Sequence, residues 1–138
     1  MSWLLCAFIS ATAAALTAIL AKVGVEGVPS NLATAIRTIV ITCFAWGLVA
    51  ATHEYGVLTS VSRRSIVFLL LSGITTGVSW LAYFRALQLG PASRVAPIDK
   101  LSLPLTVLLA GLFLGEAVSW KVWLGALLMT AGALLTIA

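Results

Sequence analysis

The chain has 138 residues, of which 62% are apolar and only 9% are charged, so it lacks the polar side chains needed to cover a water-soluble domain. Eight Lys and Arg residues against four Asp and Glu give a formal net charge of +4, and these bases are scattered along the chain. Scattered bases do not form the basic stripe of a nucleic-acid-binding protein. We therefore expect a protein of the lipid bilayer with no nucleic-acid partner.

The apolar stretches predict five membrane-spanning helices, since about 20 residues cross a hydrocarbon layer of about 30 Å. The predicted helices cover residues 3–22, 31–52, 65–89, 93–114 and 119–138. The first stretch lacks a basic leading segment, and "KVGVEG" follows it in place of a cleavage site, which favours a retained helix over a signal peptide. Short connections force neighbouring helices to run antiparallel. The expected fold is an all-α, polytopic membrane helix bundle forming a single domain over residues 1–138.

The connections carry turn and capping signals. "GVEGVPSN" separates the first two helices and leaves Ser30 or Asn31 to cap the second. "LGPASR" offers Gly90 as a stop and Pro91 as a first-turn residue of the fourth helix. "GEAVSW" is a tight return with Ser119 as the N-cap of the last helix.

Four ionisable residues fall inside the predicted spans: Arg37, Arg85, Asp99 and Lys100. All four lie ~6 to 12 Å from the same face at 1.5 Å per residue. An ionisable side chain at that depth costs at least ~2.5 kcal/mol, so it tends to pair, to face water or to serve transport. Arg and Lys near a span end can also snorkel to the headgroups, and both interpretations stay open for these residues.

Asp99 and Lys100 are adjacent, and adjacent helical residues point ~100° apart. We therefore expect each to have a separate partner, with Asp99 pairing across helices to Arg37 or Arg85. Pro97 and Pro104 flank the pair in "APIDKLSLPL" and remove donors from the helix, which predicts a broken fourth helix. Broken helices with open backbone groups are typical of transporter sites.

Two aromatic residues, Trp80 and Tyr83, lie inside the third span together with Phe84. They either fill space between helices or line a cavity with apolar walls and a few polar tips.

The basic residues near the span ends leave the topology almost balanced. Lys22 and Arg94 would lie on one side, and Arg63, Arg64 and Lys121 on the other. The excess leans towards a cytoplasmic N-terminus. A chain so nearly balanced can insert both ways, and two copies could then pack antiparallel as an inverted repeat.

From Ala86 onward, the chain closely resembles the second half of an EamA domain of the drug/metabolite transporter superfamily. The residues that carry the resemblance are the turn "ALQLGPAS", the proline-containing fourth helix, "FLGE" ending at Glu116, and "LGALLMTAG". Earlier in the chain, "AKVGVEGVPSNLATAIRT" is similar to the family's first loop and second helix, with Lys22 and Arg37 at typical positions.

The resemblance implies a five-helix unit. Most family members carry two such units in inverted orientation around a central substrate cavity, so a single unit implies a ten-helix antiparallel homodimer. Glu116 lies on the family motif, and its place at a loop indicates helix-end or interhelical hydrogen bonding. Small multidrug resistance proteins of the same superfamily use a glutamate of the first helix, but the first span here contains no acid. Asp99 is the one carboxylate well inside a span, so a role in proton coupling would fall to it.

These observations predict a multi-pass transporter of the inner (plasma) membrane that exports small metabolites or drug-like molecules by alternating access. Three bases against one acid at membrane depth favour an anionic substrate. The residues expected to bind the substrate are Lys100, Asp99, Arg37, Arg85, Trp80 and Tyr83. The residues expected to shape the helices and turns are Pro97, Pro104, Glu116, Gly90 and Pro91.

The alternative is an accessory or hetero-dimeric membrane subunit, for example half of a lipid carrier, without independent transport. No constellation of His, Cys or Ser supports an enzyme, and His53 beside Glu54 is interpreted as a solvated loop pair. We expect no catalytic residue, metal or cofactor. The sequence does not identify the substrate, the coupling ion or the direction of transport.

Overall fold

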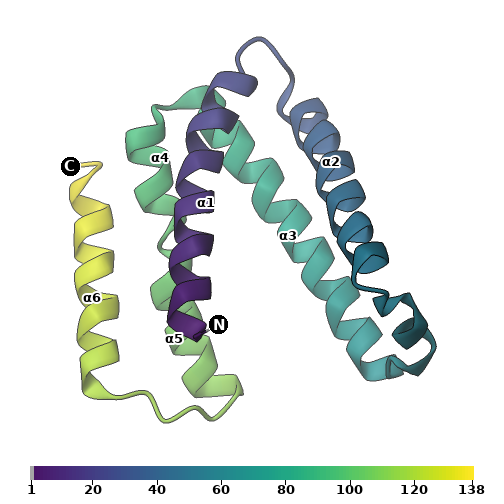
Figure 1. The fold of residues 1–138 in the computed structure, drawn as a ribbon. Coiled ribbons are helices and arrows are strands. Elements are labelled where there is room, and N and C mark those ends of the chain that lie inside the picture. Colours follow the sequence, from purple (N-terminus) through teal and green to yellow (C-terminus); the bar gives the residue numbers. More distant parts are fainter. Residues whose placement is uncertain (1) are drawn as a thin grey trace. The chain divides into compact units, whose positions relative to one another are not determined.

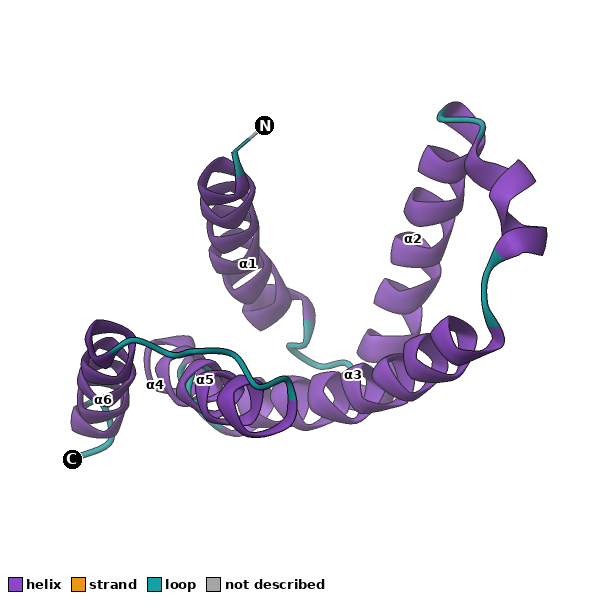
Figure 2. Ribbon diagram, turned by 90° about the horizontal axis from the view of Figure 1, so that it is seen from below, coloured by secondary structure: helices purple, strands orange, loops and turns teal. Residues whose placement is uncertain are grey.

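The computed structural model describes residues 2–138, and the regular elements in this range are helices. In chain order they are α1 (Trp3–Gly24), α2 (Ser30–Ala51), the short 3-10 helix η1 (Glu54–Ser60), α3 (Arg63–Leu89), α4 (Ala92–Asp99), α5 (Ser102–Phe113) and α6 (Trp120–Leu135). Figures 1 and 2 show them joined by loops, with no strand among the described residues. The predicted all-α class is confirmed.

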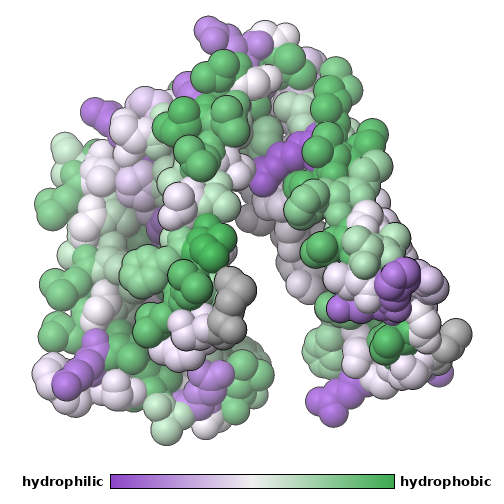
Figure 3. Space-filling model, in the orientation of Figure 1, coloured by the Kyte–Doolittle hydropathy of each residue, from purple (hydrophilic) through white to green (hydrophobic). Residues whose placement is uncertain are grey.

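The apolar helices are long enough to make this a multi-pass membrane protein. α1 and α2 have 22 residues each, α3 has 27, and α4 with α5 together cover 22. α6 has 16 residues and therefore spans ~24 Å, somewhat less than the hydrocarbon layer. Apolar side chains cover most of the visible surface in Figure 3, as lipid-facing helices require.

The helices divide into two compact units. The hairpin unit is Ala21–Gln88, with α2, η1 and most of α3. The split-helix unit combines the residues up to Leu20 with Leu89–Ala138, and holds most of α1 with α4, α5 and α6. α1 and α3 each pass from one unit into the other at their final residues.

In the hairpin unit, α2 begins at Ser30, and Pro29 precedes it with extended backbone at φ −53° and ψ 134°. The prediction that Ser30 or Asn31 caps this helix is wrong, because the proline ring already fixes a φ suited to the helix entry and Ser30 becomes the first helical residue. A glycine turns the chain between α1 and α2, since Gly27 has a φ of 72°, a conformation that residues with a Cβ rarely adopt.

In the split-helix unit, the predicted fourth span is broken into α4 and α5, as the two prolines indicated. α5 and α6 pack side by side and run antiparallel (Figure 1). The loop between them turns at Gly115, which has a φ of 65°, and the backbone N–H of Glu116 donates to the carbonyl of Ala110 at 3.3 Å. Ser119 is the N-cap of α6, as predicted.

Candidate functional site

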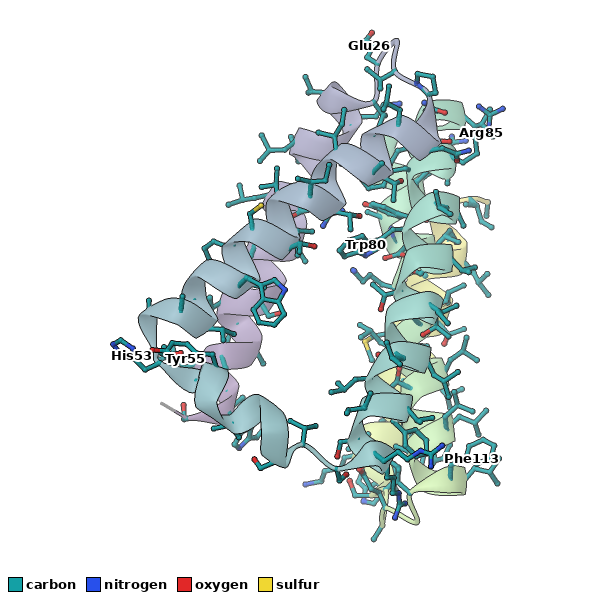
Figure 4. All side chains as sticks on the ribbon, turned by 90° about the vertical axis from the view of Figure 1, so that its right-hand side faces the viewer. Glu26, His53, Tyr55, Trp80, Arg85 and Phe113 are labelled. Atoms are coloured by element: carbon teal, nitrogen blue, oxygen red, sulfur yellow. The ribbon has the colours of Figure 1, made fainter. Side chains whose placement is uncertain are left out.

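The hairpin unit holds a cation on an aromatic surface. Arg37 lies about two turns into α2, and its Cζ atom is 4.3 Å from the centroid of the Trp80 ring on α3. The same atom is 5.5 Å from the centroid of Phe84. Trp80 points from α3 into the space towards α2 in Figure 4. These are cation–π distances, and such contacts strengthen when they are shielded from water.

The aromatic surface follows from the helical period of α3. Trp80, Tyr83, Phe84 and Leu87 have the spacing i, i+3, i+4 and i+7, which places them on one face of a helix. Phe84 and Leu87 are buried, whereas Trp80 and Tyr83 are half-buried. The rings of Tyr83 and Phe84 meet edge to face at 6.4 Å. One aromatic face therefore supports the guanidinium of Arg37.

No carboxylate among the described residues of the hairpin unit neutralises this guanidinium. The acids of the unit are Glu26, in the loop between α1 and α2, and Glu54, in η1. Within residues 2–138, the ion pair that forms joins Lys100 and Asp99, which both belong to the split-helix unit. Arg37 thus presents N–H donors inside a membrane helix with aromatic rings as its neighbours.

The end of α3 is tied to the loop between α1 and α2. The Gln88 side chain donates through Nε2 to the carbonyls of Val28 and Val25. Its Oε1 accepts a hydrogen bond of 3.2 Å from Nη1 of Arg85, and Lys22 donates through Nζ to the carbonyl of Leu87 at 2.6 Å. We call this set of contacts the loop clamp, and it gives side-chain donors to three backbone carbonyls.

The loop clamp changes the interpretation of Arg85. Its hydrogen bond to Gln88 places it in a structural network, and Figure 4 shows it pointing away from the side of α3 that carries Trp80. Sequence reasoning missed Gln88, because its partners are backbone carbonyls of a distant loop, which no residue pattern marks.

In the split-helix unit, Asp99 and Lys100 meet each other. Nζ of Lys100 lies 3.2 Å from Oδ2 of Asp99, with the two side chains 54% and 32% exposed. The prediction of separate partners is wrong. Lys100 is the C-cap of α4 and keeps a right-handed helical backbone, with φ −71° and ψ −4°, and its long flexible side chain reaches back to the carboxylate of the preceding residue.

The backbone at the break is partly closed by tight turns. The N–H of Leu101 donates to the carbonyl of Ile98 at 3.0 Å, and the N–H of Leu103 donates to the carbonyl of Lys100 at 3.0 Å. Pro104 has no N–H to donate to the carbonyl of Lys100. The N–H of Leu103, one residue earlier, donates to that carbonyl instead. Pro104 lies in the first turn of α5, where a proline is tolerated.

The other predicted positions lie at helix ends. Pro91 was predicted in the first turn of the fourth helix but is the N-cap of α4, because its backbone is extended at φ −71° and ψ 142°. Its carbonyl accepts from the N–H groups of Arg94 and Val95. Gly90 follows the last residue of α3.

An apolar groove of about 350 Å³ lies between α5 and α6. Its walls are Leu101, Pro104, Leu105, Leu108, Trp123, Ala126, Leu127 and Thr130. None of these residues is charged, and the hydroxyl of Thr130 already donates to the carbonyl of Ala126. The groove therefore offers no charged side chain to an anion. Across residues 2–138, no three His, Cys, Asp or Glu side chains gather as metal ligands.

The comparisons with known proteins agree with one another. The whole chain, residues 1–138, matches the EamA-like transporter family. A Sinorhizobium protein named "Uncharacterized transporter in cobO 3'region" is 52% identical over 134 residues, which cover 97% of this chain and 95% of that protein. A Rhizobium johnstonii protein named "Riboflavin transporter" is 37% identical over 70 residues, 51% of this chain and 23% of that protein. No solved structure matches the chain. The chain therefore belongs to the EamA-like transporter family and is a multi-pass membrane transporter.

Proposed function

We propose that this protein exports a small anionic molecule across the inner membrane by alternating access. The observation that carries the proposal is the Arg37 guanidinium, held over Trp80 inside a membrane helix with no carboxylate among the described residues of its own unit beside it. A charge at this depth is expensive, so we expect a base without a carboxylate partner in its own unit to serve transport. Arg is also the residue best suited to bidentate binding of a carboxylate or phosphate.

Lys100 and Asp99 form a second proposed substrate contact, which belongs to the split-helix unit. They lie at a helix break with prolines on both sides, a pattern typical of transporter sites. The Lys100 side chain is 54% exposed, so an anion can reach it and compete with Asp99 for it. Tyr83 adds a polar tip next to the aromatic face, and Arg85 contributes through the loop clamp.

The transporting form in this proposal is an antiparallel homodimer. Among the described residues the chain has four helices long enough to cross a membrane and the shorter apolar α6, and many secondary transporters are built from inverted repeats around a midplane site. The relative named as a transporter in Sinorhizobium is matched over 95% of its length, so it has a similar size. A tag at the C-terminus should be detected on both faces of the membrane. Detection on one face alone would contradict the antiparallel arrangement.

A screen of anions on purified protein, with the oligomeric state measured in parallel, tests the proposal. We expect dimers in proteoliposomes to move an anion and the Arg37→Gln variant to lose that transport. A monomer that transports would overturn the dimer. Reproducible co-purification with a different chain, and no transport alone, would instead identify an accessory or hetero-dimeric subunit.

Riboflavin is a second candidate substrate. A relative carries the name "Riboflavin transporter", and the flat ring system of riboflavin suits the aromatic face formed by Trp80 and Phe84. Riboflavin bears no carboxylate, so it would use the aromatic face more than the charge of Arg37. Uptake of riboflavin that survives Arg37→Gln would favour it over an anion.

A further inference from the structure

The guanidinium of Arg37 is covered from one side. Both rings within cation–π distance, Trp80 and Phe84, come from consecutive turns of α3. The side chain of Arg37 is only half-buried. A guanidinium laid on an aromatic surface keeps its N–H donors at its edge, where they can still bind an oxygen fork.

The fork geometry constrains what can dock there. A carboxylate that takes two parallel hydrogen bonds from a guanidinium lies close to the guanidinium plane. A flat group attached to that carboxylate can then lie beside Arg37, next to the face of α3 that supports the cation. That face carries Trp80, Tyr83 and Phe84, whose rings favour stacked or edge-to-face aromatic neighbours over saturated ones.

We propose that this site selects a flat aromatic anion, with its carboxylate on the N–H edge of Arg37 and its ring on the aromatic face of α3. The inference rests on the proposed function, because it names the substrate class of the same site. The inference adds a second requirement to the negative charge: the substrate must also carry a flat aromatic group. An aliphatic carboxylate of equal size and charge can use the fork of Arg37 but gains less from Trp80.

Two probes of equal charge and similar volume test the selectivity. Benzoate and cyclohexanecarboxylate are titrated into the purified full-length protein by calorimetry, with benzamide as the uncharged aromatic control. We expect benzoate to bind about two- to tenfold more tightly than cyclohexanecarboxylate, the range of aromatic pair energies. Benzamide should bind more weakly than benzoate, because it lacks the anionic fork.

Two variants assign the effect to the residues. Trp80→Leu should bring the two carboxylates to equal affinity, and Trp80→Phe should keep part of the preference even if the leucine variant folds poorly. Arg37→Lys retains the charge but loses the planar fork, so it should weaken both carboxylates together. Equal affinities in the unaltered protein would overturn the aromatic selectivity and leave the anion site standing. Binding of neither carboxylate would overturn the anion site itself.

Discussion

The membrane-embedded cations of the two units have different neighbours: aromatic rings in the hairpin unit and a carboxylate in the split-helix unit. In the hairpin unit, Arg37 rests on the rings of Trp80 and Phe84, and no carboxylate among the described residues of that unit lies beside it. In the split-helix unit, Lys100 lies 3.2 Å from its neighbour Asp99. One cation is stabilised by polarisable rings that leave its charge intact, and the other is neutralised by an internal anion.

This difference separates two roles for a membrane-embedded base. A cation over an aromatic ring still attracts an anion, because the ring adds no negative charge. A cation already paired with a carboxylate must first give up that partner. We therefore expect Arg37 to dominate the affinity for an anionic substrate, and the Asp99–Lys100 pair to modulate it.

The largest expected effect is the loss of Arg37. Arg37→Gln should weaken the best anion found in a screen by about ten- to hundredfold, the value of hydrogen bonds to a charged group. Lys100→Gln should weaken the same anion less, because Asp99 already occupies that cation. Equilibrium binding to both variants checks the order, with Lys121→Gln at the exposed start of α6 as the control. If Lys100→Gln weakened anion binding more than Arg37→Gln, Lys100 and not Arg37 would be the main contact of the anion.

The next effect concerns the loop clamp of the hairpin unit. Gln88→Met keeps the length of the side chain but removes the donor to Val25 and Val28, which should lower the free energy of unfolding by about 1–3 kcal/mol. Thermal unfolding in a mild detergent measures the change. Arg85→Met removes one hydrogen bond to Gln88 and should cost less. Equal costs would show that Arg85 has a further role.

Each unit has one turn that depends on glycine, and these turns should respond alike. Gly27 and Gly115 have positive φ values of 72° and 65°, so Gly27→Ala and Gly115→Ala should each destabilise the protein by about 1 kcal/mol. Gly132, in α6, is the matched control and should tolerate alanine, because a methyl group added there would meet open space. Thermal unfolding of the three variants compares them. A tolerated Gly115→Ala would mean that the loop after α5 rearranges freely.

The smallest expected effect on stability is that of Asp99→Asn. Because the ion pair is partly exposed to solvent, its loss should change the free energy of unfolding by less than about 1 kcal/mol. The anion affinity should rise, since Lys100 is released from its internal partner. Unfolding and binding are measured on the same preparation. A fall in affinity would show that Asp99 helps to hold the substrate.

Much of the fold could be predicted from the sequence. The apolar stretches, the break in the fourth span and the N-cap at Ser119 depend on local rules of length, hydropathy and backbone conformation. The cap of α2 was predicted at the wrong residue, because Pro29 shifts the helix entry by one position. Such errors of one residue are inherent in local signals.

The candidate site was predicted less completely. Arg37 and Trp80 were singled out separately, but their contact joins side chains of two different helices and cannot be read from spacing within one helix. Gln88 was missed because its partners are carbonyls about 60 residues earlier in the chain, and carbonyls have no signature in the sequence.

The amino-acid sequence by itself determined that this protein is a set of apolar helices with a few embedded charges, because bilayer thickness and the cost of buried charge act on each segment alone. The tertiary structure decided which charges are neutralised. Arg37 contacts two rings of α3, and this contact depends on the rotation and separation of two helices, which are set only when they come together. Lys100 forms its ion pair with the neighbouring Asp99, because its flexible side chain bends back to that carboxylate.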